Sequence, residues 1–190
     1  MKGMKVVKYD VLFIGELVRG LIKYDTEKNR IQTKKLEDSK GSRSCVEQAI
    51  CYIGLKEYTA AENLLKQAKI KDPINAQAYL YLGVLYEILE LYEKAMSEYK
   101  QAIKLDKNNY EANFSYGNLC LNYLGKPYDA IEYFKKAAST LLEAKFCLGV
   151  IEAYFLSDKK GSKSRGLNNI EEAIQQDETL RELLPYYPKI

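Results

Sequence analysis

The sequence predicts an all-α protein, a right-handed α-solenoid of tandem helix-turn-helix hairpins with an N-terminal capping segment. Small residues recur about every 34 positions, and apolar residues within each period follow the three-to-four spacing of a helix face. A fixed period of this length is typical of units that bury their apolar faces only against their neighbours. The recurring small residues form three series: Ala49, Gly83, Gly117 and Gly149; Ala61, Ala95 and Ala130; and Ala68, Ala102, Ala137 and Ala173.

Composition argues against catalysis. The chain has 190 residues and is 47% hydrophobic, enough for one domain with a sizeable core. It contains 17 tyrosines but no histidine, which removes the usual general base and the commonest metal ligand. No glycine-rich phosphate loop, nucleophile elbow or metal-ligand cluster is visible in the sequence. We therefore predict a protein that is not an enzyme and needs no cofactor or metal.

The distribution of charge and the cysteines limit which partners and which cellular compartment are expected. Residues 1–41 carry ten Lys/Arg and six Asp/Glu, so their net charge is +4. The rest of the chain carries 19 Lys/Arg and 20 Asp/Glu, so its net charge is −1. Spaced lysines among acids indicate a solvated surface rather than a nucleic-acid footprint. No apolar stretch reaches the ~20 residues that cross a bilayer. Four cysteines without a C-x-x-C pair are expected to be structural thiols, which favours a soluble cytoplasmic protein.

The clearest repeat covers residues 76–109. Its first helix is expected to pack through two aromatic residues around a Leu-Gly pair, and its second through an aromatic residue between two alanines; the residues are Tyr79, Leu82, Gly83, Tyr86, Ala95, Tyr99 and Ala102. Helices cross closely only where glycine or alanine removes bulk, and aromatic rings fill the space beside the crossing. The pattern closely resembles the tetratricopeptide repeat (TPR). The resemblance implies a non-catalytic protein that binds other proteins.

Three further repeats are predicted around this one. Residues 42–75 keep the alanines and end at Asp72-Pro73, where proline stops a helix. Residues 110–141 contain one extra residue, expected in the turn 124–127. Residues 142–178 form a degenerate fourth repeat with Leu148, Gly149, Ile170 and Ala173, and the polar stretch 157–164 is expected to lengthen its hairpin loop. Residues 179–190 are expected to form a C-terminal cap and tail.

Residues 1–41 do not match the repeat well. The apolar residues Val11, Ile14, Val18 and Leu21 fit a helix with a broad apolar face, although an extended conformation is also compatible with the run. The following residues, around Ile31, make a poor second helix. The segment is expected either to cap the first hairpin or to occupy the groove of the solenoid, and a polar linker leads from it to the first repeat.

The predicted binding surface is the concave groove lined by the first helix of each repeat. Side chains there that do not pack within the repeat are largely apolar, and extended apolar surfaces usually mark binding sites. We expect a partner peptide or helix to bind in this groove, with the partner's identity and the oligomeric state open. An alternative function is a small chaperone that holds an apolar segment of a secreted or assembling protein; a nucleic-acid-associated helical repeat is less favoured. The candidate residues are Val46, Ile50, Ile53, Leu80, Val84, Glu87, Phe114, Asn118, Leu121, Phe146, Val150 and Tyr154.

Overall fold

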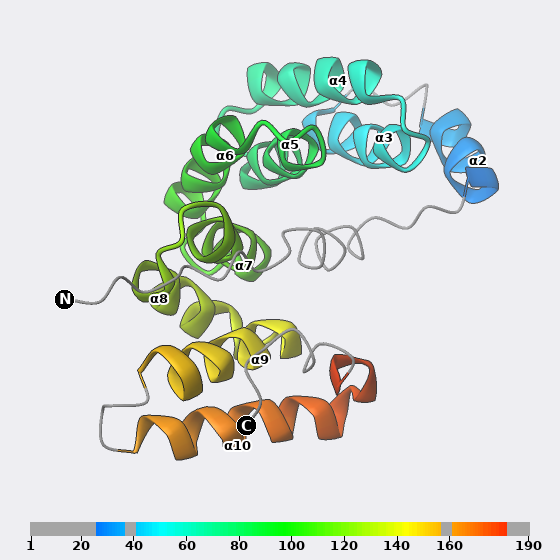
Figure 1. The fold of residues 1–190 in the computed structure, drawn as a ribbon. Coiled ribbons are helices and arrows are strands. Elements are labelled where there is room, and N and C mark those ends of the chain that lie inside the picture. The colour runs from blue at the N-terminus through cyan, green and yellow to red at the C-terminus, as the bar shows by residue number, and fades with distance from the viewer. Residues whose placement is uncertain (1–25, 37–40, 157–160, 182–190) are drawn as a thin grey trace. The chain divides into compact units, whose positions relative to one another are not determined.

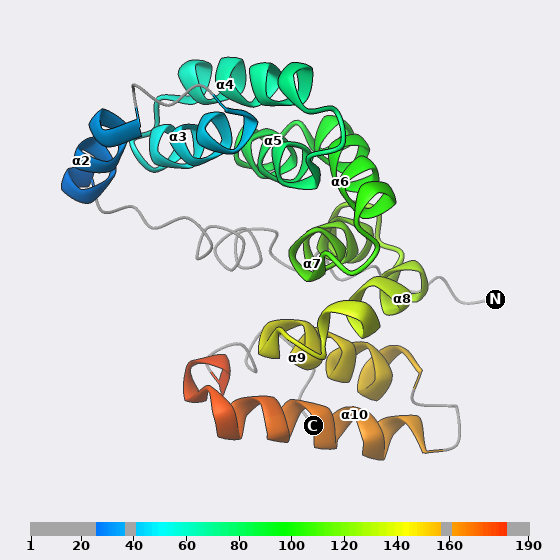
Figure 2. The same cartoon turned by 180° about the vertical axis from the view of Figure 1, so that it is seen from behind.

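A computed structural model describes residues 26–36, 41–156 and 161–181 of the chain. These residues form α-helices and two short π-helical segments, and no strand occurs among them. They divide into two compact units, residues 26–112 and 113–181. Both units are built from helical hairpins (Figures 1 and 2), so the prediction of an all-α chain is confirmed.

The first unit contains two hairpins preceded by a single helix. α3 pairs with α4 and α5 pairs with α6, while α2 packs against α3 and α4 packs against α5. In Figures 1 and 2, α3 and α5 lie side by side, and α4 covers the same flank of both. The segment around Ile31 therefore does form a helix, contrary to its weak apolar pattern, because the flank of α3 supplies a packing surface. The bounds are α2 (Thr26–Leu36), α3 (Ser42–Gly54), α4 (Tyr58–Lys71), α5 (Ala76–Ile88) and α6 (Tyr92–Leu105).

The small residues allow the two helices of each hairpin to approach closely. A Cβ atom added to Gly83 of α5 would lie 2.6 Å from two ring carbons of Tyr99 on α6. Tyr99 is fully buried, as are Ala61 on α4 and Ala95 on α6. The residues that carried the repeat pattern in the sequence are therefore the residues at the helix crossings, where bulk is excluded.

The tight turn within each hairpin of the first unit has the same backbone geometry. Lys56 and Glu90, which are 34 residues apart, have positive φ angles of 63° and 59°. In each case the next residue donates its amide to a carbonyl five residues earlier: Glu57 to Tyr52, and Leu91 to Tyr86, both at 2.8 Å. This bond closes a helix C-terminus around a left-handed residue. The turn is therefore part of the repeat, although no glycine marks it in the sequence.

A second recurring feature is an aspartate that follows the second helix of a repeat. Asp72, Asp106 and Asp177 each follow the last turn of a helix, and each accepts a backbone amide two residues later through its carboxylate, at 3.3, 3.0 and 3.0 Å respectively. An aspartate in this position stabilises the turn that redirects the chain after a helix. The third repeat has Leu141 where the other repeats have aspartate, counted from Ala137. Its second helix, α8, ends at Ala137, and four residues separate it from α9, as between α4 and α5.

The second unit contains two hairpins whose first helices end in π-helical turns. The extra residue of the third repeat lies in the first of these turns, η1, where Leu124 donates to Leu119 five residues earlier. The expectation that it lies in the turn 124–127 is therefore wrong: widening one helical turn absorbs an inserted residue without moving the hairpin loop. The bounds are α7 (Tyr110–Asn118), which starts in the first unit, η1 (Leu119–Tyr123), α8 (Pro127–Ala137), α9 (Leu142–Val150), η2 (Ile151–Phe155) and α10 (Ser162–Gln176).

The fourth repeat is more regular than its sequence indicates. Gly149 on α9 and Gly166 on α10 face each other so closely that a Cβ on Gly166 would lie 2.5 Å from the carbonyl oxygen of Gly149. Gly166 thus takes the place that Ala61 and Ala95 hold in earlier repeats, and Ile170 and Ala173 are buried behind it. Helix α10 begins at Ser162, so the last residues of the stretch 157–164, expected to be a loop, are helical.

The two ends of the chain are only partly described. Residues 178–181 form a single 3₁₀ turn in which Leu180 is buried. The remainder of the predicted C-terminal tail lies outside the described residues. The predicted N-terminal apolar helix and most of the linker that follows α2 also lie outside them.

Candidate protein-binding surface

The twelve predicted groove residues fall on the first helix of each repeat, three to a helix. Six belong to the first unit, on α3 and α5, and six belong to the second, on α7, η1, α9 and η2. Within each helix they are spaced by three or four residues, so each set shares one face. By helix they are Val46, Ile50 and Ile53; Leu80, Val84 and Glu87; Phe114, Asn118 and Leu121; and Phe146, Val150 and Tyr154.

Most of these side chains are buried. Nine of the twelve belong to the core, and the partly buried ones are Ile50, Glu87 and Tyr154. Neighbouring residues of the same helices are more accessible: Gln77 is exposed, and Tyr81 and Ile88 are partly buried. Tyr81 was not among the residues predicted to line the groove. The only sign of it in the sequence is that an aromatic residue directly follows Leu80. That these twelve residues form a binding surface stays a prediction.

Glu87 brings an acidic group into the otherwise apolar face of α5. Tyr99 of α6 donates its hydroxyl to the Glu87 carboxylate at 2.6 Å. Burial raises the pKa of Glu87 to about 7, and the hydrogen bond from Tyr99 opposes this rise only in part. No lysine or arginine of the described residues forms an ion pair with Glu87. Ionising this carboxyl group therefore costs folding free energy.

Stability is expected to fall between about pH 4.5 and pH 7 because of Glu87. In this interval the folded chain holds a proton on Glu87 that the unfolded chain, with an ordinary carboxyl pKa near 4.5, has released. The Glu87→Gln variant lacks this proton difference, so it should be more stable than wild type by about 2 kcal/mol at pH 8 and by much less at pH 4.5. Urea unfolding at both pH values tests this. An equal difference between the variants at the two pH values would contradict it.

Asn118 is a buried amide with unmet hydrogen-bonding capacity. It is 1% exposed, and neither Oδ1 nor Nδ2 of its side chain has a hydrogen-bond partner among the described residues. Phe114 and Leu121 lie on the same helical face, one turn to either side. The side-chain amide offers a carbonyl acceptor and two donor hydrogens, and a peptide backbone presents the complementary N–H and C=O groups. Leaving such a group unsatisfied costs about 1 to 3 kcal/mol, so the Asn118 side chain lowers the stability of the folded chain.

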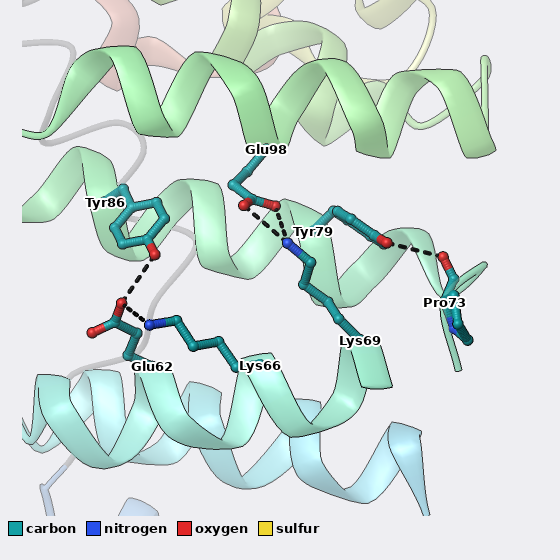
Figure 3. Close-up of polar contacts among 7 residues, drawn as sticks. All are labelled: Glu62, Lys66, Lys69, Pro73, Tyr79, Tyr86 and Glu98. Carbon is teal, nitrogen blue, oxygen red and sulfur yellow. Dashed lines mark hydrogen bonds and ion pairs between the residues drawn. The ribbon is translucent and has the colours of Figure 1, made fainter. Parts of the chain in front are cut away.

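A polar network joins the two hairpins of the first unit (Figure 3). Lys69 of α4 places its Nζ 2.7 and 2.9 Å from the two carboxylate oxygens of Glu98 on α6, and 4.4 Å from the ring centre of Tyr79 on α5. A second branch links Tyr86 of α5 to Glu62 of α4 at 2.9 Å, and Glu62 also pairs with Lys66 at 2.7 Å. One lysine thus contacts both helices of the following repeat.

Replacing Lys69 with methionine is expected to lower stability by about 1 to 2 kcal/mol. The Lys69 and Glu98 side chains are 25% and 17% exposed, so their interaction is only partly screened by water, and the contact with the Tyr79 ring is lost as well. The control is Lys135→Met, which removes an exposed pair with Glu132 at 3.5 Å and should cost less than about 0.5 kcal/mol. Thermal unfolding of both variants tests the difference; equal losses would contradict it.

The four cysteines lie in the interior of the described chain. All four cysteines are buried and none of them forms a disulfide, and burial raises the pKa of Cys147 to about 12. No group of three potential metal ligands occurs among the described residues. No helix among them is both long and apolar enough to cross a membrane.

Comparison with known families decides what the hairpins are. The sequence model of the tetratricopeptide repeat matches residues 76–109, which form α5, α6 and the loop after them. Residues 76–109 are a tetratricopeptide repeat. The match covers the unit in which Gly83 packs against Tyr99, so the recurring sequence pattern and the close helix crossing belong to the same motif.

Solved structures show the TPR fold over most of the chain. A crystal structure of MamA aligns with 89% of this chain and 97% of its own, with 21% identity and a TM-score of 0.59. YrrB, described as a TPR protein with an unusual peptide-binding site, aligns with 93% of this chain and 90% of its own, at 22% identity and a TM-score of 0.56. PilW, described as a widely conserved type IV pilus biogenesis factor, aligns with 76% and 64%, at 22% identity and a TM-score of 0.60. Curated protein sequences give no match.

Proposed function

We propose that this TPR protein is a non-catalytic scaffold or adaptor whose first helices bind a peptide or helix of a partner protein. The observation that carries the proposal is Asn118, a buried amide without a partner among the described residues, set between two apolar side chains of the same face. An unsatisfied buried amide is stabilised by any group that supplies its hydrogen bonds, and a peptide main chain flanked by apolar side chains would supply them between these two residues.

The TPR repeat supports the proposal because proteins with this fold share a type of surface. Proteins built from stacked hairpins offer an extended surface of first helices, and the fold alone does not name a partner. Among structures of this fold, YrrB is described as having a peptide-binding site. A peptide is therefore the first ligand to test here.

The decisive variant is Asn118→Val. Valine has nearly the size of asparagine and removes both unsatisfied groups, so the free protein should become more stable by about 1 kcal/mol. If Asn118 binds a peptide backbone, the same substitution should weaken binding at least tenfold, because a ligand hydrogen bond is lost. Binding is measured with peptides selected from a random-peptide phage library on the full wild-type chain.

If Asn118→Val raises the stability and lowers the affinity for peptides, Asn118 has a binding role rather than a structural one. The matched control is Asn168→Val on the exposed surface of α10, which should change neither affinity nor stability by more than about 0.5 kcal/mol. Destabilisation by Asn118→Val, or unchanged affinity for selected peptides, would reject Asn118 as the binding residue. Charged substitutions at Phe114 or Phe146 are less informative because both side chains are buried and a charge would disturb the core.

A second candidate is a small chaperone that holds an apolar segment of another protein. The partly accessible side chains of Ile50, Tyr81 and Ile88 on the first helices are apolar or aromatic, which favours this function over recognition of a charged motif. The two functions differ in selectivity. An adaptor should select peptides with a shared motif, whereas a chaperone should select varied peptides with little in common except apolar content.

A further inference from the structure

Glu87 occupies a position that the other repeats fill with an apolar side chain. Four residues after the recurring small residue of each first helix, the other repeats have Ile53, Leu121 and Ala153, and all three are buried. The fold therefore accepts an apolar residue at this position, whereas a carboxyl group there is costly to ionise, as its raised pKa shows. Such departures from what the fold itself requires are expected at functional sites.

One oxygen of the Glu87 carboxylate is held in place, and the other is left for a second donor. Tyr99 of α6 donates its hydroxyl to Oε2 at 2.6 Å, which orients the carboxyl group from within the hairpin. Within the described chain, Oε1 takes part in no hydrogen bond or ion pair. Glu87 is only partly buried, unlike its three apolar equivalents, so part of its side chain reaches the surface of α5.

The first helices around Glu87 supply no cation for it. Helix α5 contains neither lysine nor arginine, and the single basic residue of α3 is Arg43, in its first turn. The lysines of these two hairpins lie on the second helices instead, three on α4 and three on α6. The charge of Glu87 is thus left for a partner to neutralise.

We propose that Glu87 selects a partner segment in which one lysine or arginine is flanked by apolar residues, with the cation paired to Oε1. The proposal rests on the proposed function, because it names the chemistry of the segment that the first helices bind. A charge-assisted hydrogen bond is about twice as strong as a neutral one, so a cation compensates the cost of ionising Glu87 better than a neutral donor does. The partly accessible neighbours Tyr81 and Ile88 are aromatic and apolar, which favours apolar flanking residues.

A double-mutant cycle on the full chain tests the pairing. Peptides selected from the random-peptide phage library on wild type at pH 8, where Glu87 is ionised, should share a lysine or arginine. Replacing that residue with norleucine in a synthetic peptide should weaken binding to wild type about tenfold, measured by titration calorimetry. The same replacement should change binding to Glu87→Gln by less than about twofold, because glutamine carries no charge. Glu87→Gln is expected to be the more stable protein, so unfolding does not account for a loss of affinity.

The matched control is Glu90→Gln. Glu90 is exposed and lies in the turn between α5 and α6, so this variant removes the same charge from the same hairpin at a different place. It should bind both peptides as wild type does. Equal effects of norleucine on wild type and Glu87→Gln would overturn the proposal, as would selected peptides that lack a lysine or arginine. A loss in Glu90→Gln as large as in Glu87→Gln would also overturn it, because net charge would then explain the effect.

The proton released on binding is a second measurement. Among the described residues, the titratable group in contact with Glu87 is the Tyr99 hydroxyl of α6. The pKa of Glu87 is about 7 in the free chain, and a cation at Oε1 lowers it. At pH 7 the lysine peptide should therefore release up to about half a proton from wild type and none from Glu87→Gln, measured by titration calorimetry in buffers of different ionisation enthalpy. Proton uptake, or a release that Glu87→Gln retains, would contradict the pairing.

Failure of this proposal differs from failure of the proposed function. If the selected peptides depend on Asn118 but not on Glu87, the scaffold function stands and the preference for a cation is wrong. If the library yields no binding peptide, both are wrong.

Discussion

Replacing Gly166 with alanine is expected to destabilise the α9–α10 hairpin by about 3 to 4 kcal/mol. A Cβ atom at this position would lie 2.5 Å from the backbone nitrogen of Ala153 and 2.5 Å from the carbonyl oxygen of Gly149. These atoms belong to the facing helix backbone, so no side-chain rotation can relieve the overlap and the two helices must separate. The gain of about 1 kcal/mol in helix propensity from glycine to alanine is too small to compensate.

The appropriate control is Gly41→Ala, because a Cβ at Gly41 meets nothing within 4 Å. This substitution should change stability by less than about 1 kcal/mol. Urea unfolding monitored by circular dichroism gives both values, and hydrogen exchange of the α9 and α10 amides localises the loss. A Gly166→Ala variant as stable as the Gly41→Ala variant would show that the two helices do not approach each other this closely at Gly166.

Replacing Tyr99 with alanine is expected to lower stability by about 4 kcal/mol. The Tyr99 ring is fully buried against Gly83, and its removal leaves a cavity at the closest crossing of α5 and α6. The substitution also removes the hydroxyl that donates to Glu87 at 2.6 Å, which leaves a buried carboxyl group without that bond. Both effects act in the same direction.

Tyr99→Phe separates the ring from the hydroxyl. Phenylalanine retains the packing but not the hydrogen bond, so its cost should be about 1 to 2 kcal/mol, and the pKa of Glu87 should rise further because the bond that lowers it is gone. Unfolding at pH 5 and pH 8 measures both effects: the deficit of Tyr99→Phe should be larger at pH 8. A loss from Tyr99→Phe as large as that from Tyr99→Ala would show that the hydroxyl, not the ring, carries the stability.

The hairpins could be predicted from the sequence because their determinants are small residues at fixed spacing. Gly83, Tyr99 and Ala102 recur with a period that only stacked helical pairs explain, and the structure places them at a helix crossing. Gly166 escaped the same reasoning because a longer loop displaces it from the period, although its spacing to Ile170 and Ala173 repeats that of Ala95 to Tyr99 and Ala102. Comparing spacings within the second helix, rather than between repeats, would have found it.

The candidate surface was harder to predict than the fold. Spacing places Val84 and Asn118 on the faces of their helices, but it does not give their burial, which depends on groups far away in the sequence. The hydrogen bond between Tyr99 and Glu87 likewise depends on the angle at which two helices cross. Such properties arise from three-dimensional packing and leave no periodic signal in a single sequence.

The π-helical turns have a consequence for how this chain can vary. A residue inserted into an α-helix rotates every later side chain by about 100°, which would turn Ala130 and Phe134 out of the core if the rotation were transmitted. The widened turn at Leu119–Tyr123 confines the rotation to a few residues, and both core residues stay fully buried. A length change inside one repeat is thus tolerated locally, and the end of the first helix is where new side-chain directions can arise while the scaffold is conserved.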